Sequence, residues 1–185
     1  MKGAGVVGAA VAGYFILNSD NAAKAQPVPA GQLPATHLLH AALSFVWLGL
    51  VLGISFLESW VKFRADLITR VVGLDVGRNV FHALNRVEIV FALAAFLLTV
   101  KDIVAHSPST LVTGVWLAPV VIVALQSLWL QPLLDARARM FIKGTPLPKS
   151  QSWLHLAYVL VELAKVLALA LSPFLYAPFS GLLGF

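Results

Sequence analysis

Carboxylates, histidines and Lys165 interrupt long apolar segments of this sequence. An ionisable side chain that faces lipid near the centre of a bilayer costs about 3 kcal/mol or more, so such residues usually line a site or pathway inside the protein. Glu162 and Lys165 lie three positions apart, which predicts an ion pair on one helix. The residues that predict a polar interior able to bind or pass a small solute or protons are Glu58, Asn85, Glu88, Asp135, His155, Tyr158, Glu162 and Lys165.

The polar residues of each apolar segment share one helical face when successive residues are placed about 100° apart. Turning these faces inward predicts two polar groups joined through Glu162 and Lys165. The first group is Glu58, Asn85, Glu88, Gln131, Asp135, His155 and Tyr158. The second group is His37, His40, Asp102 and His106. The alternative interpretation is a polar network that only fixes how the helices pack, because hydrogen bonds between membrane helices need no further function.

The histidines also allow two cofactor hypotheses. His40 and His106 lie on different segments near one end, as the two axial ligands of a b-type haem require. His155, Glu58 and Glu88 have the ligand types of a metal site. No haem motif accompanies them. The primary prediction is therefore a protein without a cofactor or metal ion, with haem b as the lesser alternative.

The motifs give no support for catalysis. The GxSxG, HExxH and P-loop patterns are absent, and Ser44 and Ser55 are better explained as small packing residues. The chain has no cysteine, which excludes disulfides, thiolate-bound clusters and cysteine nucleophiles. The sequence predicts a protein that is not an enzyme.

The composition indicates a membrane protein. Hydrophobic residues make up 59% of the 185 residues and charged residues only 11%, whereas a soluble domain is about 25% charged. The net charge is +5, but the basic residues lie beside apolar segments, where they set topology and attract anionic lipid headgroups. The predicted partner is the lipid bilayer and not nucleic acid.

The chain divides into a short N-terminal part and a four-helix transmembrane domain. Residues 1–36 combine an apolar segment, which is either an uncleaved anchor or a signal-like segment, with a Pro/Ala-rich linker. Residues 37–185 predict an all-α, integral membrane antiparallel four-helix bundle. Its four spans, each long enough to cross a bilayer, are expected at about 37–61, 85–105, 110–134 and 151–172. A helix starting at Asp75 is expected to lead into the second span.

The connecting segments differ strongly in charge. The first carries Lys62, Arg64, Arg70, Arg78 and Arg86. The third carries Arg137, Arg139, Lys143 and Lys149. By the positive-inside rule, loops 62–86 and 135–150 face the cytoplasm. The predicted location is the bacterial inner membrane, with an organellar inner membrane as the alternative.

Gly49 and Gly53 lie on the face of the first span opposite its polar residues. Small residues four apart are typical of close contact between membrane helices. This face predicts a contact with the N-terminal segment, with a second copy in a homodimer, or with another subunit of a larger membrane complex. An accessory subunit of such a complex is therefore a rival to the solute or proton function.

Two stretches of the sequence carry a family resemblance. The first is Ser55-Phe56-Leu57-Glu58 … Lys62-Phe63, continued by Gly77-Arg78 … Phe81 … Ala83-Leu84-Asn85-Arg86-Val87-Glu88. The second is His155-x-x-Tyr158-Val159-x-x-Glu162-x-x-Lys165-Val166. Both resemble a family of uncharacterised bacterial four-helix integral membrane proteins. The resemblance covers about 37–172, and in layout alone the chain is similar to the transmembrane protein 205 family. It implies a small multi-pass protein with no established activity and transfers no site residue.

Overall fold

The computed structural model describes residues 35–106, 108–146 and 153–175, without the side chain of residue 106. The predicted N-terminal segment and nearly all of the linker lie outside the described residues. Within the described part of the chain every regular element is helical. The predicted all-α class is confirmed.

Four helices make up the described part of the chain, and three of them join more than one element. The first helix joins α2 (Ala35–Val51), the π-helical turn η1 (Leu52–Glu58), α3 (Ser59–Val61) and the 3-10 turn η2 (Lys62–Arg64). The second is α4 (Arg70–His106). The third joins α5 (Thr110–Leu125), the π-helical turn η3 (Gln126–Leu130) and α6 (Gln131–Ile142). The last is α7 (Leu154–Leu171), extended by the 3-10 turn η5 (Ser172–Phe174).

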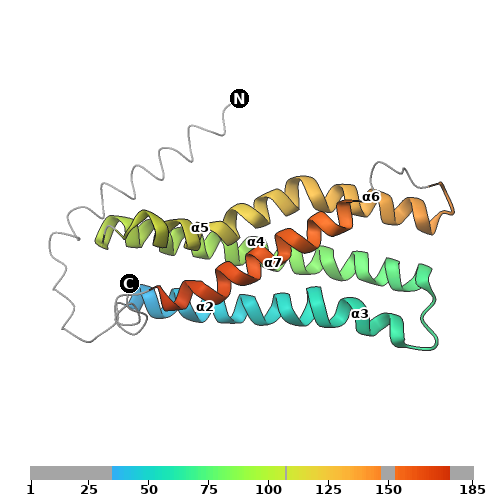
Figure 1. Ribbon diagram of the computed structural model, residues 1–185, viewed down its shortest axis with the longest axis horizontal. Coiled ribbons are helices and arrows are strands. Elements are labelled where there is room, and N and C mark those ends of the chain that lie inside the picture. The colour runs from blue at the N-terminus through green and yellow to red at the C-terminus, as the bar shows by residue number, and fades with distance from the viewer. Residues whose placement is uncertain (1–34, 107, 147–152, 176–185) are drawn as a thin grey trace, which may run out of the picture.

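Successive helices run in opposite directions and lie side by side (Figure 1). α4 contacts α2 and α5, while α7 contacts the same two helices. In Figure 1, α7 crosses the bundle obliquely between the first and third helices. The connection between α2–η2 and α4 is short, so these two helices form a tight antiparallel pair.

The start of α4 differs from the prediction. The helix begins at Arg70, where the Thr69 hydroxyl accepts a hydrogen bond from the Val72 amide at 3.3 Å. Asp75, expected to cap the helix, instead lies inside it and accepts a hydrogen bond from Arg78 at 2.8 Å. A threonine before the first turn satisfies a free helical amide, so the helix extends further toward the N-terminus than Asp75.

Three of the four helices are long and apolar enough to cross a membrane by length and composition: Ala35–Arg64, Thr110–Ile142 and Leu154–Phe174. The fourth span, predicted at 85–105, lies within α4. It carries Arg86, Glu88, Lys101 and Asp102 within that stretch.

The interior is unusually polar and the exterior unusually apolar. Among the described residues, eleven polar or charged side chains and eleven hydrophobic ones are buried. Large hydrophobic side chains such as Leu93, Leu97, Leu128 and Leu167 are more than half exposed. This distribution is the reverse of that in a soluble bundle, in which buried charged residues are rare.

Candidate functional site

Lys165 lies at the centre of a buried polar cluster, defined here as the central cluster: Trp47, Ser55, Glu88, Gln126, Glu162 and Lys165. The Lys165 ammonium is fully buried and donates to Glu88 Oε1 at 2.5 Å and to Gln126 Oε1 at 2.9 Å. It also lies 2.9 Å from Glu162 Oε2. The three donors of the ammonium are therefore all used. The ion pair predicted between Glu162 and Lys165 is confirmed.

Both carboxylates of the central cluster hold further donors. Glu162 accepts from Ser55 Oγ at 2.6 Å and from Gln126 Nε2 at 2.6 Å. Glu88 accepts from Trp47 Nε1 at 2.9 Å. All four helices thus contribute to one network, with two carboxyl groups facing one ammonium. When all three groups are ionised, the cluster carries one uncompensated negative charge.

The two π-helical turns lie at this cluster. Ser55 is in η1 and Gln126 is in η3, and both side chains donate to Glu162. A π-helical turn contains one residue more than an α-helical turn and is often found at functional sites. The extra residue changes which face of the helix beyond the turn is directed toward the interior.

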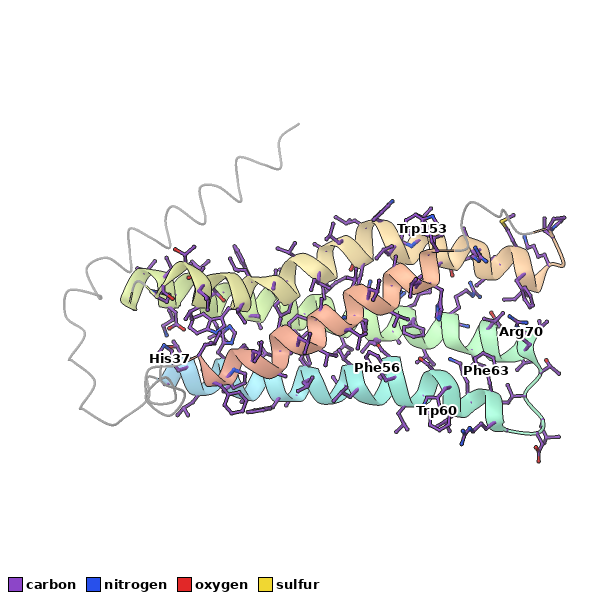
Figure 2. All side chains as sticks on the ribbon, viewed as in Figure 1. His37, Phe56, Trp60, Phe63, Arg70 and Trp153 are labelled. Carbon is purple, nitrogen blue, oxygen red and sulfur yellow. The ribbon has the colours of Figure 1, made fainter. Side chains whose placement is uncertain are left out.

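A second cluster lies toward the end of the bundle that carries Arg70, which Figure 2 labels. We define it as the basic-end cluster: Asp75, Arg78, His82, Asp135 and Arg139. Asp135 pairs with Arg139 at 2.8 Å, with His82 Nε2 at 3.1 Å and with Arg78 at 3.4 Å. Gln131 Nε2 lies 3.3 Å from the other ring nitrogen of His82. The hydrogen bond to Asp75 raises the pKa of Arg78, so the guanidinium stays charged.

A cavity of about 320 Å³ lies between the basic-end cluster and the central cluster. Glu162 and Ser55 line its inner end, while Arg78, His82 and Asp135 line it toward the basic end. Residues from all four helices form its walls. Phe56 and Phe63, labelled in Figure 2, line it from the first helix. The cavity therefore joins the buried carboxylate Glu162 to the basic end of the bundle.

Two glycines of α4 let the first helix pack closely beside this cavity. A Cβ at Gly77 would lie 2.5 Å from Lys62 Nζ, and a Cβ at Gly73 would overlap the ring of Phe63. Lys62 Nζ also lies 5.6 Å and 5.8 Å from the ring centroids of Phe63 and Phe81. Because Gly77 has no side chain, there is room for the Lys62 ammonium beside the cavity.

A third polar group lies at the opposite end, where Figure 2 labels His37. His37 Nε2 is 3.6 Å from Asp102, and His40 Nε2 is 3.4 Å from Thr99 Oγ1. The His40 ring stacks on Trp116 with 4.7 Å between centroids. Ser172 Oγ donates to Ser44 Oγ at 2.8 Å between this group and the middle of the bundle. The structure thus brings His37, His40 and Asp102 together, as predicted.

The remaining predicted site residues are placed less centrally. Glu58 pairs with Lys62 at 3.0 Å and is partly exposed. Asn85 accepts from Ser127 Oγ at 2.8 Å. Tyr158 lines the cavity and meets the edge of Phe81, with 5.7 Å between ring centroids. His155 was expected inside the bundle but is exposed, because it lies in the first turn of α7, and only lines the cavity.

The two cofactor hypotheses stand differently in the structure. His40 Nε2 lies 3.4 Å from Thr99 Oγ1, and the His40 ring stacks on Trp116. The His106 side chain lies outside the described residues, so the haem pair of His40 and His106 stays a prediction. Among the described residues no group of three or more His, Asp or Glu is arranged to hold a metal ion. The suggested metal set of His155, Glu58 and Glu88 is therefore wrong. Glu88 is committed to Lys165 and Trp47.

Gly49 and Gly53 face away from the packed interior. No heavy atom lies within 4 Å of a Cβ built on either glycine. The predicted position of this face, opposite the polar residues of the first span, is confirmed.

Sequence reasoning missed four residues of the site: Trp47, Gln126, Gly73 and Gly77. Trp47 was read as apolar, although its indole N–H needs a partner when buried. Gln126 was left off the polar face of the third span because regular helical spacing was assumed through η3. The spacing Gly73-x-x-x-Gly77 was itself visible, since it repeats the pattern noted at Gly49 and Gly53.

The chain matches no family model, no curated protein and no solved structure. The function is accordingly inferred from the residues and their geometry.

Proposed function

We propose that this chain is a small multi-pass membrane protein in which all four helices cross the bilayer. The apolar outer surface supports this, because it suits acyl chains better than water. The charges of α4 are compatible with a span, since Glu88 and Asp102 are 2% and 0% exposed within the bundle. The basic loops 62–86 and 135–150 would lie on the cytoplasmic side, in a bacterial inner membrane.

Its interior would bind a small solute in the cavity and exchange a proton at the central cluster. The observation that carries this proposal is that the cavity ends at Glu162, one of two buried carboxyl groups sharing one lysine. An uncompensated buried charge is costly, so one proton shared by the carboxyl pair would neutralise the cluster. Tyr158, one of several titratable side chains in the cavity wall, belongs to the same helix as Glu162. A proton or solute entering from the basic end would reach this pair through the cavity.

Reconstitution tests this function. The protein is placed in vesicles that enclose a pH-sensitive dye, and the internal pH is followed after a pH step with and without a membrane potential. Proton movement above that of empty vesicles is expected for the wild type. It should fall to the background rate in Glu162→Gln and in Lys165→Met.

The matched control is Asp66→Asn, which removes an exposed carboxylate at the same end of the bundle. This variant should keep the wild-type rate. Equal rates in wild type, Glu162→Gln and Lys165→Met would exclude movement of protons through the central cluster.

An accessory subunit of a larger membrane complex is the second candidate. The open face at Gly49 and Gly53 supports it, because nothing within the described residues packs there. Gly-x-x-x-Gly faces allow close helix contacts in membranes. Light scattering of the protein purified in mild detergent separates these roles. A complex or homodimer that dissociates in Gly53→Leu supports docking at this face, and a monomer in the wild type contradicts it.

A further inference from the structure

The cavity contains cationic groups whose hydrogen-bonding capacity is only partly used. The Lys62 ammonium has three donors, and the structure gives it one hydrogen bond, to Glu58 at 3.0 Å. Its side chain is only 9% exposed. Nε of Arg78 is buried without a hydrogen-bond partner. Lys62 and Arg78 both line the cavity.

The acidic groups of the cavity are, by contrast, already occupied. Both oxygens of Asp135 accept from Arg78, His82 or Arg139. Both oxygens of Glu162 accept from Ser55, Gln126 or Lys165. The cavity therefore offers spare donors and few spare acceptors. Spare buried donors favour a ligand that brings acceptor oxygens, since an unpaired buried polar group is costly.

Most of the remaining wall is apolar. Phe56, Phe63, Leu74, Phe81, Leu134 and Val159 line it. Ligand cavities range over roughly 300–1,000 Å³, and this one lies at the small end of that range. A ligand that fits such a space has one charged group and a short apolar body.

The surroundings of the cavity favour an anion. Arg64, Arg70, Arg139 and Lys143 lie at the same end of the bundle, and a surface rich in one sign of charge concentrates ligands of the opposite sign. An organic cation in the cavity would lie beside Lys62 and Arg78 and be repelled by both. The surrounding positive charge and the spare hydrogen-bond donors therefore both favour an anionic ligand.

We propose that the cavity binds a small amphipathic anion, with its anionic oxygens on Lys62 and Arg78 and its alkyl chain along the phenylalanine-rich wall. A medium-chain carboxylate has this chemistry, and so does the phosphate of an anionic lipid with part of an acyl chain. This inference deepens the proposed function by naming the class of solute, and it rests on that function.

The test measures binding and not transport. The protein is placed in nanodiscs of phosphatidylcholine, and saturable binding of radiolabelled octanoate is measured against empty nanodiscs. Octylamine and octanol, with the same chain length, compete for the bound octanoate. Octanoate is expected to bind saturably and to be displaced by unlabelled octanoate, but not by octylamine at the same concentration.

Variants of Lys62 test whether its ammonium binds the carboxylate of octanoate. Lys62→Met should weaken octanoate binding by about ten-fold or more, because a charge-assisted hydrogen bond is lost. Lys143→Met, which removes an exposed lysine from the same end, should bind as the wild type does. Lys62→Arg should retain most of the affinity, since it keeps the charge.

A second variant avoids any change of charge. Gly77→Ala adds a Cβ next to Lys62 Nζ and displaces the ammonium, so it should also weaken binding. Gly49→Ala, on the open face, is its control. Equal affinity in the wild type, Lys62→Met and Gly77→Ala overturns the proposal, as does displacement of octanoate by octylamine or equally by octanol.

A change of lipid in the nanodiscs distinguishes a free carboxylate from a lipid phosphate as the natural ligand. If nanodiscs with phosphatidylglycerol abolish octanoate binding in the wild type, a lipid phosphate occupies the same site. If they leave it unchanged, the site takes the free carboxylate. If octanoate binds but no protons move, the anion site stands and only proton exchange is rejected. If protons move but octanoate does not bind, proton exchange stands and the anion site is rejected.

Discussion

Lys165 lowers the energetic cost of burying the carboxylates of Glu88 and Glu162. Its ammonium meets Glu88 of α4, Gln126 of η3 and Glu162 of its own helix, and it is fully buried. Removing one partner of a buried ion pair is more damaging than replacing the whole pair, because the remaining charge stays buried and uncompensated.

Lys165→Met should therefore destabilise the protein by about 3–5 kcal/mol. Adding Glu88→Gln and Glu162→Gln to it should recover part of this loss, because the uncompensated carboxylates are removed as well. Thermal unfolding in detergent, followed by circular dichroism, measures both effects. Lys143→Met is the control and should leave the midpoint unchanged. A midpoint for Lys165→Met equal to that of the control would show that the cluster contributes little to stability.

At this scale the sequence predicted the charged members of the central cluster but not their neutral partners. Glu88, Glu162 and Lys165 could be found because an ionisable side chain in an apolar segment is costly anywhere but the interior. Trp47 could not be separated from other apolar residues by hydrophobicity alone. His155 was misplaced because the first turn of α7 is open to the surroundings.

At the scale of elements, the π-helical turns determine which residues meet. η3 joins α5 and α6 into one continuous helix, and its extra residue changes the face of α6 relative to α5. α5 contributes to the His37 end of the bundle through Trp116, and α6 contributes to the basic-end cluster through Asp135. The helical spans and their order could be predicted from apolar periodicity. The two π turns could not, because no residue type marks them.

Deleting Leu128, an exposed residue of η3, should convert this turn to regular α-helix, because a π-helical turn holds one residue more than an α-helical turn. Asp135 would then still face His82, and the expected thermal midpoint is close to that of the wild type. Deleting Leu93, an exposed residue of the regular helix α4, is the control. It rotates the residues that follow by about 100° and should lower the midpoint clearly. Equal falls in the midpoint for the two deletions would contradict a role for η3 in absorbing an extra residue.

At the scale of the whole molecule, the position of α4 decides the topology. The described part of the chain buries as many polar or charged side chains as hydrophobic ones, and α4 carries more charged residues than its neighbours. If α4 crosses the bilayer, Ala65 and Ser109 lie on opposite sides, since they precede and follow it. Ala65 and Gly144 then lie on the same side.

The absence of cysteine makes this directly measurable. Single cysteines replacing Ala65, Gly144 or Ser109 can be labelled with a membrane-impermeant maleimide in intact cells and in inverted vesicles. We expect positions 65 and 144 to react only in inverted vesicles and position 109 only in intact cells. Labelling of positions 65 and 109 from the same side would show that α4 does not span the membrane.

The lysine that faces the two buried carboxyl groups belongs to α7, which is synthesised after the helices that it contacts. It lies 77 positions after Glu88 and 39 after Gln126. While the ribosome is still making α7, the earlier helices hold Glu88 with no ammonium beside it. Insertion of the nascent chain in the bilayer is therefore less favourable until α7 inserts. A chain ending at residue 152 should be degraded faster in pulse-chase labelling than the same truncation with Glu88→Gln. Equal lifetimes would indicate that quality control does not sense this carboxylate.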